Sequence, residues 1–308
     1  MSGPILSTAP IAAATVASNE LRRELQTLLL ALVQRPGRQS LKLKVPSTQT
    51  GAPQDGMSYH FKPEIHFQLE GESEFILAGG RLLLLGGETA ILPALVPHRL
   101  ADTGAAASGR RMVVGFYSSA VSMHYAHAGQ GVEAIGLYQT SRLRQLVELT
   151  EMLADFHQGN RPHAAPAQHA LEAALLWMLI DLLDDEVPET GTDSNRIFQV
   201  KWLVHSHLSN PELSVTFLAE QMRVSAGYLS HLFGGGADGS LIQYIHQQRV
   251  TRAIEALGSN KLSVSEIAWA CGFTDPGYFG RIFRKQTGLT PQAYRKKLED
   301  DARIDASG

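Results

Sequence analysis

The last third of the chain repeats itself, and this duplication limits the possible folds more than any other feature of the sequence. Leu213-Ser214-Val215 recurs as Leu262-Ser263-Val264, and Ala219 recurs as Ala268, both at an offset of 49 residues. One extra residue near Pro276 changes the offset to 50. Beyond it aromatic residues recur in pairs: Tyr228 with Tyr278, Phe233 with Phe283, and Tyr244 with Tyr294. Such a repeat predicts two copies of one supersecondary unit.

Each copy carries the signals of two short helices joined by a tight turn. A capping serine begins the first helix, and a small alanine within it allows a second helix to cross closely. We expect first helices over 215–222 and 264–271, and second helices capped by Ser225 and Thr274. This arrangement is a helix-turn-helix, whose second helix fits the major groove of DNA. Two helical hairpins without a ligand are the alternative, but they do not explain why caps, turn and apolar spacing recur together.

The charge distribution agrees with a nucleic-acid partner. Residues 196–297 carry 12 Lys and Arg against 6 Asp and Glu, whereas the rest of the chain carries 15 against 24. Within the basic segment, residues 261–297 have seven basic and two acidic residues, and residues 213–240 have one and two. A basic segment joined to an acidic one is expected when only one domain meets phosphates. The second copy should therefore hold DNA more strongly than the first.

Composition excludes several other classes of protein. The single cysteine, Cys271, rules out an internal disulfide framework and fits a reducing compartment. The longest apolar runs, such as residues 28–33, are too short to cross a bilayer. The apolar stretch over 5–17 lacks the basic lead of a signal peptide. We therefore expect a cytoplasmic protein that does not associate with a membrane.

The N-terminal part combines helical and strand patterns. A helix is expected over 19–34, and apolar stripes predict two more helices, a hairpin, between residues 141 and 186. Between residues 57 and 125, short runs broken by glycine and proline indicate antiparallel strands in a barrel or sandwich. The expected strands are 64–70, 74–78, 81–85, 89–92 and 112–117.

The polar stretch 187–195 is the best candidate for a linker. A long amphipathic helix over 241–257 should separate the two repeat copies.

The C-terminal sequence resembles the DNA-binding domain of the AraC/XylS family of transcription regulators. The resemblance covers about a third of the chain, residues 196–298, and depends on Ile267-Ala268, on Gly272-Phe273-Thr274-Asp275, and on the run from Tyr278 to Lys285 followed by Gly288-Leu289-Thr290-Pro291. Residues 249–257 resemble the linker helix of the family. The resemblance implies two helix-turn-helix units and a bipartite, asymmetric DNA site.

The resemblance also identifies candidate DNA contacts. In the second copy these are Thr274, Pro276, Gly277, Gly280, Arg281, Arg284 and Lys285. Arg281 is the candidate for base contact, because a guanidinium can bind guanine O6 and N7 together, while Arg284 and Lys285 should reach phosphates. In the first copy the matching positions are Gly227, Ser230 and His231. The first copy departs from the family pattern, since Gly234-Gly235-Gly236 follows its aromatic residue where a basic pair is usual.

The strand-rich segment resembles the cupin-like sensor domain that many family members carry. The matching residues are the run 63–72, Gly87, Pro93 and Pro97-His98. His60, Glu64 and His98 fall at three of the four ligand positions of metal-binding cupins, but Ser58 stands at the fourth. Three such ligands would suffice for zinc or iron. The interpretation we favour is that no metal binds and that His98 only caps a strand.

These features together predict an α+β protein. We expect an N-terminal arm and helix (1–56), a cupin-like β-barrel with a helical hairpin (57–186), a linker (187–195), an all-α domain with two helix-turn-helix units (196–298) and a tail (299–308). The candidates for effector contact are His60, Glu64, His66, Gln68 and His98. His66 and Gln68 share a strand face with Glu64 and could line a pocket, or could face solvent.

The expected function is a non-enzymatic, sequence-specific transcription regulator. Its partners would be double-stranded promoter DNA, a small-molecule effector in the barrel, a second copy of the chain paired through the helical hairpin, and RNA polymerase if the regulator is an activator; no cofactor is expected. No nucleophile triad, P-loop or dinucleotide fingerprint supports catalysis. Two alternatives remain open: a metal-dependent cupin enzyme that carries a DNA-binding tail, and a ligand-independent dimeric regulator.

Overall fold

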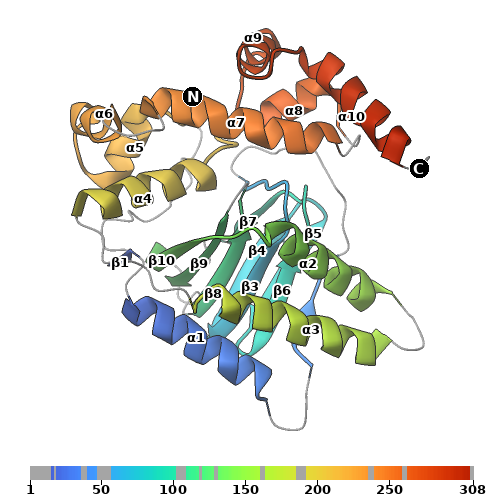
Figure 1. The fold of residues 1–308 in the computed structure, drawn as a ribbon. Coiled ribbons are helices and arrows are strands. Elements are labelled where there is room, and N and C mark those ends of the chain that lie inside the picture. The colour runs from blue at the N-terminus through green and yellow to red at the C-terminus, as the bar shows by residue number, and fades with distance from the viewer. Residues whose placement is uncertain are drawn as a thin grey trace. The chain divides into compact units, whose positions relative to one another are not determined.

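The computed structural model describes residues 15–16, 19–35, 40–46, 57–101, 109–117, 120–127, 131–159, 164–184, 192–234, 239–258 and 262–305. The chain forms two compact units, residues 1–198 and 199–308, which are described separately. Figure 1 shows strands and helices in the first unit and helices in the second, so the expected α+β class is confirmed. Among the described residues, no helix is both long enough and apolar enough to span a membrane.

The first unit contains two β-sheets. The larger has the order β1-β10-β9-β8-β3-β6-β2, and the smaller has the order β5-β4-β7. Neighbouring strands are antiparallel except in the pairs β1–β10 and β2–β6. The strands are β1 (Thr15–Val16), β2 (Lys42–Lys44), β3 (Glu64–Glu70), β4 (Glu72–Leu77), β5 (Gly80–Leu85), β6 (Glu88–Leu92), β7 (His98–Leu100), β8 (Arg110–Phe116), β9 (Ala120–His127) and β10 (Gly131–Gln139).

The expected barrel is not closed. Within the part of the chain that the structure describes, no ladder of backbone hydrogen bonds joins the two sheets, because β5 and β7 end the smaller sheet and β1 and β2 end the larger one. The strand region also extends further than expected, since β9 and β10 carry it to residue 139. These two strands contain many small residues with weak strand propensity, and pairing along their length compensates for it.

One face of the large sheet is apolar and carries the helices α1 (Asn19–Val33), α2 (Leu143–Gln158) and α3 (Ala164–Asp181), as Figure 1 shows. Alternation along β3 directs Ile65 and Phe67 to this face, where both are buried. The helices contribute buried leucines spaced one or two turns apart, among them Leu25 and Leu29 of α1, Leu146 and Leu153 of α2, and Leu175 and Leu179 of α3. Helix α1 therefore shares the core of the sheet.

The second unit consists of seven described helices, of which α7 is the longest. Its helices are α4 (Thr192–Ser206), α5 (Val215–Met222), α6 (Ala226–Gly234), α7 (Leu241–Gly258), α8 (Val264–Ala270), α9 (Pro276–Thr287) and α10 (Pro291–Asp305). Helices α5 and α6 form the first helix-turn-helix unit, α8 and α9 form the second, and α7 separates them as expected. Helix α4 starts before the unit boundary, so the last four residues of the expected linker are helical, while residues 187–191 lie outside the described residues.

The helix caps follow the sequence signals with one correction. The Ser214 hydroxyl accepts a hydrogen bond from the Phe217 N–H, and Ser263 forms a reciprocal capping box with Glu266. The Ser225 hydroxyl likewise accepts from the Tyr228 N–H at 3.1 Å. Thr274 does not cap α9 as expected. Its place is taken by Asp275, whose carboxylate accepts from the Gly277 N–H.

The reason for this correction is the extra residue in the second copy. Pro276 occupies the first helical position of α9. Proline suits that position, because its missing N–H would have no partner within the helix and its φ is already helical. The residue before the proline must therefore be the cap, and Asp275 stands 50 positions after Ser225, as the larger offset of the repeat requires.

Candidate DNA-binding surface and buried polar cluster

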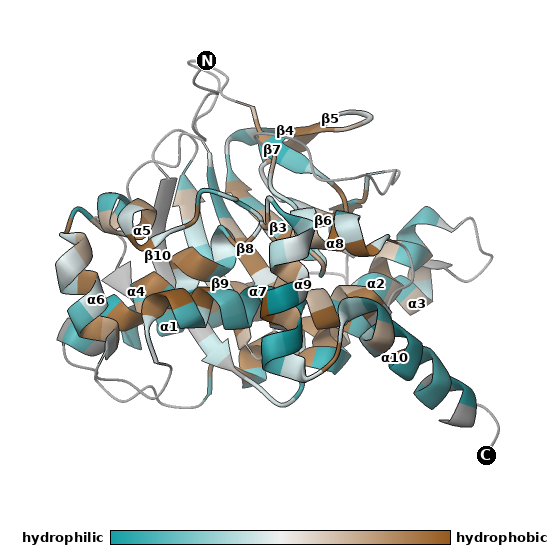
Figure 2. Cartoon of the chain, turned by 90° about the horizontal axis from the view of Figure 1, so that it is seen from above, coloured by the Kyte–Doolittle hydropathy of each residue, from teal (hydrophilic) through white to brown (hydrophobic). Residues whose placement is uncertain are grey.

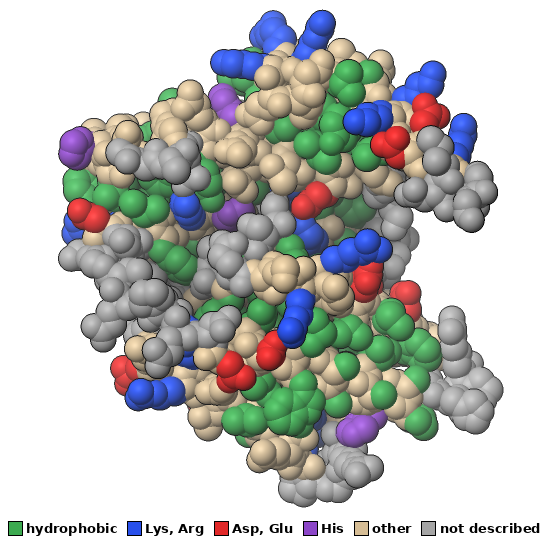
Figure 3. Space-filling view, viewed as in Figure 1, with side chains coloured by type: hydrophobic (Ala, Val, Ile, Leu, Met, Phe, Trp, Pro, Cys, Tyr) green, Lys and Arg blue, Asp and Glu red, His purple; other side chains and the backbone are tan. Residues whose placement is uncertain are grey.

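Helix α9 has one buried and one exposed face. Phe279 and Phe283 lie one turn apart, both are fully buried, and their ring centres are 5.5 Å apart. Residues on the opposite face are exposed: Gly277, Arg281, Arg284 and Lys285. Lys and Arg side chains gather over this part of the second unit (Figure 3), and α10 is hydrophilic along most of its length (Figure 2). The exposed face of α9 is thus basic, as a surface for DNA requires.

Contacts near the start of α9 position the side chains of its basic face. The Arg281 guanidinium lies over the Tyr278 ring, 5.7 Å from its centre, and the Tyr278 hydroxyl is 3.5 Å from His246 Nε2 on α7. Thr274 is exposed next to the helix start, while Pro276 and Gly280 are half-buried. One of the first N–H groups of α9 already binds Asp275. The other backbone N–H groups in the first turn of α9 can approach a phosphate.

A buried arginine of α7 packs against the turn of the second helix-turn-helix unit. Arg249 is 6% exposed, donates from Nη2 to the Asn210 carbonyl at 2.7 Å, and lies over the Phe273 ring. Burial lowers the pKa of Arg249 to about 10, so it stays charged at neutral pH. The adjacent turn needs Gly272, because its φ is +80° and a Cβ there would lie 2.3 Å from the Leu208 carbonyl oxygen.

The first helix-turn-helix unit has the same geometry and less charge. On α6, Leu229 and Phe233 are buried, while Gly227, Ser230 and His231 are exposed. The described part of α6 contains no Lys or Arg. The helix ends at Gly234, the first of the three glycines, and residues 235–238 lie outside the described residues. The structure thus brings the candidate DNA contacts onto the exposed faces or starts of two helices, α6 and α9.

A second group of candidate residues lies on the polar face of the large sheet. Strand β3 places Glu64, His66 and Gln68 on the face opposite to the helices. His66 is 4% exposed and Gln68 is 2% exposed, so neither faces solvent. On the paired strand β8, Arg111 lies opposite Gln68 and is 6% exposed. The alternative in which His66 and Gln68 face solvent is therefore wrong, and their lining of a pocket stays a prediction.

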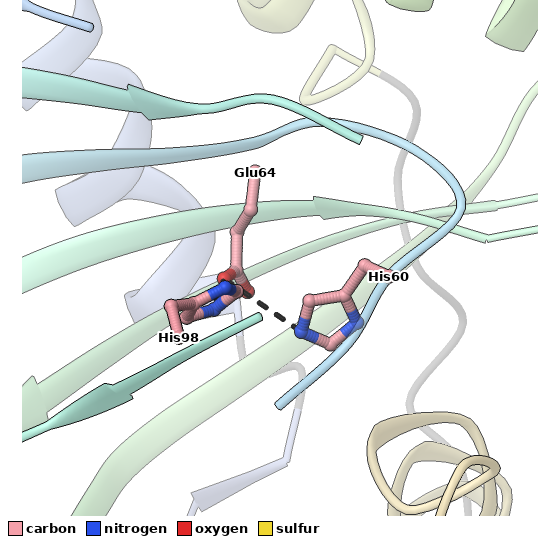
Figure 4. A group of neighbouring side chains, drawn as sticks. All are labelled: His60, Glu64 and His98. Carbon is pink, nitrogen blue, oxygen red and sulfur yellow. Dashed lines mark ion pairs between the residues drawn. The ribbon is translucent and has the colours of Figure 1, made fainter. Parts of the chain in front are cut away.

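Three histidines converge on Glu64 at one end of this face. The distances from Glu64 Oε2 are 3.0 Å to His66 Nε2, 3.4 Å to His98 Nε2 and 3.9 Å to His60 Nε2. Figure 4 shows His60 and His98 pointing toward the Glu64 carboxylate. Burial alone would raise the pKa of Glu64, but His66, His60 and His98 outweigh it and hold this pKa well below its usual range. Glu64 is therefore ionised, so its carboxylate can accept hydrogen bonds from imidazole N–H groups or serve as a ligand for a cation.

Two polar residues of this cluster were not predicted from the sequence. Arg111 and His124 lie on β8 and β9, and both side chains point to the same face as His66, because Val113 pairs with His66 and with His124. Burial lowers the pKa of His124 to about 4 and that of Arg111 to about 10. A strand was expected over 112–117, but its polar face could not be recognised, because Arg111 shares that face with the apolar Val113 and with Gly115.

Comparison with known proteins agrees with the geometry of the second unit. Residues 218–297 match the family model of a helix-turn-helix domain. The Msm operon regulatory protein of Streptococcus mutans is 26% identical over 77% of this chain and 85% of its own length. The arabinose operon regulatory protein of Escherichia coli is 27% identical over 34% of this chain and 36% of its own length. A solved DNA-binding domain of AdpA, in complex with a target DNA, is 30% identical over 34% of this chain and 93% of that chain, with a TM-score of 0.32.

The fold, the basic face of α9 and the family match define a class of protein. The second unit is a helix-turn-helix DNA-binding domain, and the chain is a DNA-binding transcription regulator. Its helix-turn-helix domain is of the AraC/XylS type, as the resemblance in the sequence predicted.

Proposed function

We propose that this chain is a one-component regulator, in which α9 reads bases in a major groove and a small molecule bound by the first unit alters DNA binding. The DNA-binding part of this proposal rests on the exposed basic face of α9. Arg281, Arg284 and Lys285 lie on this face, opposite the buried Phe279 and Phe283. Helix α6 would enter a neighbouring groove and contribute less affinity, because its exposed residues carry little charge. The test is binding of the full chain to DNA fragments selected from a random pool, at stated salt concentration.

Replacing Arg281 with Ala is expected to weaken binding to the selected site by about 1–3 kcal/mol and to relax preference at one or two base positions. A guanidinium that binds one guanine contributes both affinity and selectivity, whereas a phosphate contact contributes affinity alone. The measurement is a gel-shift series against the selected site and single-base variants of it. Lys285→Ala is the matched control, because it should weaken binding to all of these fragments about equally. Unchanged affinity and unchanged preference for Arg281→Ala would contradict the placement.

The effector half of the proposal is supported by the polar cluster of the first unit. Buried polar side chains are costly unless they are hydrogen-bonded, so a cluster of them inside a small unit suits a ligand better than a purely structural core does. A ligand can switch DNA binding only if it binds one arrangement of the protein better than another. The proposal includes a homodimer, because Met152 on α2 and Trp177 on α3 are about half exposed. RNA polymerase would be a further partner if the regulator activates.

A second candidate function has support from one specific observation. The ligand atoms of His60, Glu64 and His98 all lie within 4.8 Å of one another. The His98 Nδ1 is 2.9 Å from the Val96 carbonyl oxygen, so its N–H can be held there while Nε2 faces Glu64. Two imidazoles and a carboxylate are a donor set that suits zinc or iron(II), and such a second-shell hydrogen bond orients a metal-binding histidine. A metal held by these three residues would supply Lewis acidity to a metal-dependent cupin function.

Metal content of the purified full chain tests this candidate. If the three residues hold a metal, His98→Ala should weaken zinc or iron(II) binding more than about 100-fold, since even outer-shell partners are worth about 10- to 100-fold. Metal is measured by elemental analysis after dialysis against each ion. His157→Gln, an exposed histidine change on α2, is the control and should leave metal content as it is. A wild-type chain that retains no stoichiometric metal would remove the candidate.

A further inference from the structure

We propose that the polar face of the large sheet in the first unit binds a small hydroxylated carboxylate, such as a sugar acid, with Arg111 as the partner of the carboxylate group. This inference rests on the proposed effector-controlled function and names the chemical class of the effector. It depends on four strand residues that the register places on one face: His66 and Gln68 of β3, Arg111 of β8 and Ser122 of β9.

The register places the four side chains in one continuous surface. Arg111 lies opposite Gln68, and Ser122 lies opposite Gly115, which itself pairs with Glu64. Residues directly opposite in an antiparallel pair project to the same face of a sheet. The four side chains are 0–6% exposed, so solvent does not reach them from outside the unit. A ligand held here would therefore be enclosed.

Each of the four side chains has a buried polar atom with no hydrogen-bond partner in the protein. These atoms are His66 Nδ1, Gln68 Oε1, Arg111 Nε and Ser122 Oγ. The Arg111 guanidinium makes one long contact, from Nη1 to Ser73 Oγ of the small sheet at 3.5 Å. Leaving a buried polar atom unpaired costs about 1–3 kcal/mol, more for a charged group. Four such atoms on one face indicate a surface shaped for a polar partner.

The donors and acceptors among these atoms specify the chemistry of that partner. Arg111 offers N–H donors and a positive charge, which match a carboxylate. The amide of Gln68 offers the acceptor Oε1 to a ligand, while its Nε2 donates to the Glu70 carbonyl. His66 directs Nε2 to the Glu64 carboxylate, so Nδ1 of the neutral ring is also an acceptor. Two acceptors and the Ser122 hydroxyl match hydroxyl groups of the ligand.

The two ends of the face differ in charge, which sets the orientation of the ligand. Gln68, opposite Arg111, is four residues from Glu64 along β3, roughly 13 Å of strand. A carboxylate at the Gln68 end of the face would therefore lie farther from the Glu64 carboxylate than one beside His66. Hydroxyl groups at the other end would meet His66 and Glu64, which accept hydrogen bonds. A neutral sugar would leave the buried guanidinium with only the attraction of Glu64 and no directly bound carboxylate, and a simple fatty acid would leave the acceptors unpaired.

The test uses the full chain and a matched panel of probes. Thermal shift and titration calorimetry are run with D-gluconate, D-galacturonate and L-lactate, with D-galactose as the neutral match of galacturonate, and with hexanoate as a carboxylate without hydroxyls. We expect at least one hydroxy acid to bind about 10- to 100-fold more tightly than either control probe, since a charge-assisted hydrogen bond carries that much selectivity. Equal binding of D-galactose, or no binding of any hydroxy acid, would overturn the inference.

Variants on one strand assign the binding to Arg111. Arg111→Gln should lower affinity for the acid about 10- to 100-fold. Arg110→Gln is the matched control, because Arg110 is the neighbouring residue of β8, lies over the Tyr125 ring on the other face, and should leave affinity unchanged. If Arg111→Gln fails to fold, Arg111→Lys and Ser122→Ala replace it, each with an expected loss of several-fold. Equal losses in the Arg110 and Arg111 variants would also overturn the assignment.

DNA binding is measured separately so that the two proposals can fail independently. Gel shifts on the selected DNA site are run with and without the acid that binds. An acid that binds through Arg111 without changing DNA affinity supports the ligand class and contradicts effector control. A chain that binds its DNA site but none of the acids contradicts the ligand class alone.

Discussion

Replacing Phe283 with Ala is expected to lower the free energy of unfolding of the second unit by about 3–5 kcal/mol. Phe283 is fully buried, with its ring centre 5.5 Å from that of Phe279 and 5.6 Å from that of Tyr294. The truncation removes the contacts that dock α9 between its neighbours and leaves a cavity that the aromatic cluster cannot close. Domains are stable by about 5–15 kcal/mol, so the loss is a large part of the total. Denaturant unfolding of the full chain, followed by helical circular dichroism, measures it.

DNA affinity should fall with this variant although Phe283 does not face DNA. Packing of the buried face fixes the position of α9. The loss of the Phe283 ring therefore lets α9 move, and Arg281 is no longer held in one position relative to DNA. Trp269→Ala is the matched control, because Trp269 is an aromatic residue of α8 that is 51% exposed, and its loss should change stability by less than about 1 kcal/mol. Equal effects of the two truncations would show that Phe283 does not anchor α9.

Lowering the pH from 6.5 toward 4 is expected to destabilise the first unit by about 3 kcal/mol through His124 alone. Burial lowers the pKa of His124 from 6.5 to about 4 in the folded chain. Between these values the unfolded chain binds a proton at His124 and the folded chain does not. The unfolded state therefore gains stability as the pH falls, and the folded state loses it. The loss grows as the pH falls below about 6.5 and levels off only below pH 4, where the folded chain also binds a proton at His124.

The variant His124→Gln isolates this contribution. Unfolding free energies of the wild-type chain and the variant are measured across the same pH range in buffer with a chelator, and their difference is compared. Glu64 and His66 titrate in both proteins, and both interact with His124, so the change in slope reports His124 together with its coupling to them. His157→Gln, an exposed change on α2, should leave the slope unchanged. A variant with the acid sensitivity of the wild type would contradict the buried, neutral state of His124.

Much of the second unit could be predicted because its signals are local. Ser214, Ser263 and Ser225 cap helices through hydrogen bonds to residues three positions away, and Gly272 supplies a positive φ at a single residue. The sequence missed the role of Asp275 only because the extra residue shifts the cap, a shift that Pro276 decides. The buried Arg249 could not be recognised, since its partners at residues 208 and 210 are some 40 positions away.

The first unit was predicted less completely. Strand β3 was predicted with its observed bounds because Pro63 and Gly71 flank it. Strands β9 and β10 were not predicted, although Gly129 precedes β10 in the sequence, because small residues within both strands weaken their apolar pattern. The helical stripes on α1, α2 and α3 were visible from their spacing. Those stripes could not predict that α1 packs on the large sheet. An apolar stripe indicates that one face of a helix is buried, but it does not identify the surface that covers this face.

The sequence by itself determined the kinds of element, the doubled helix-turn-helix and the basic face of α9, because periodicity, caps and turns are encoded within a few residues. Only the tertiary structure decided the polar cluster. Arg111 comes to lie opposite Gln68, and His124 on the same face as His66, through strand register between segments that are far apart in the chain. Register depends on which faces can be buried together, so it is settled when the sheets and helices pack.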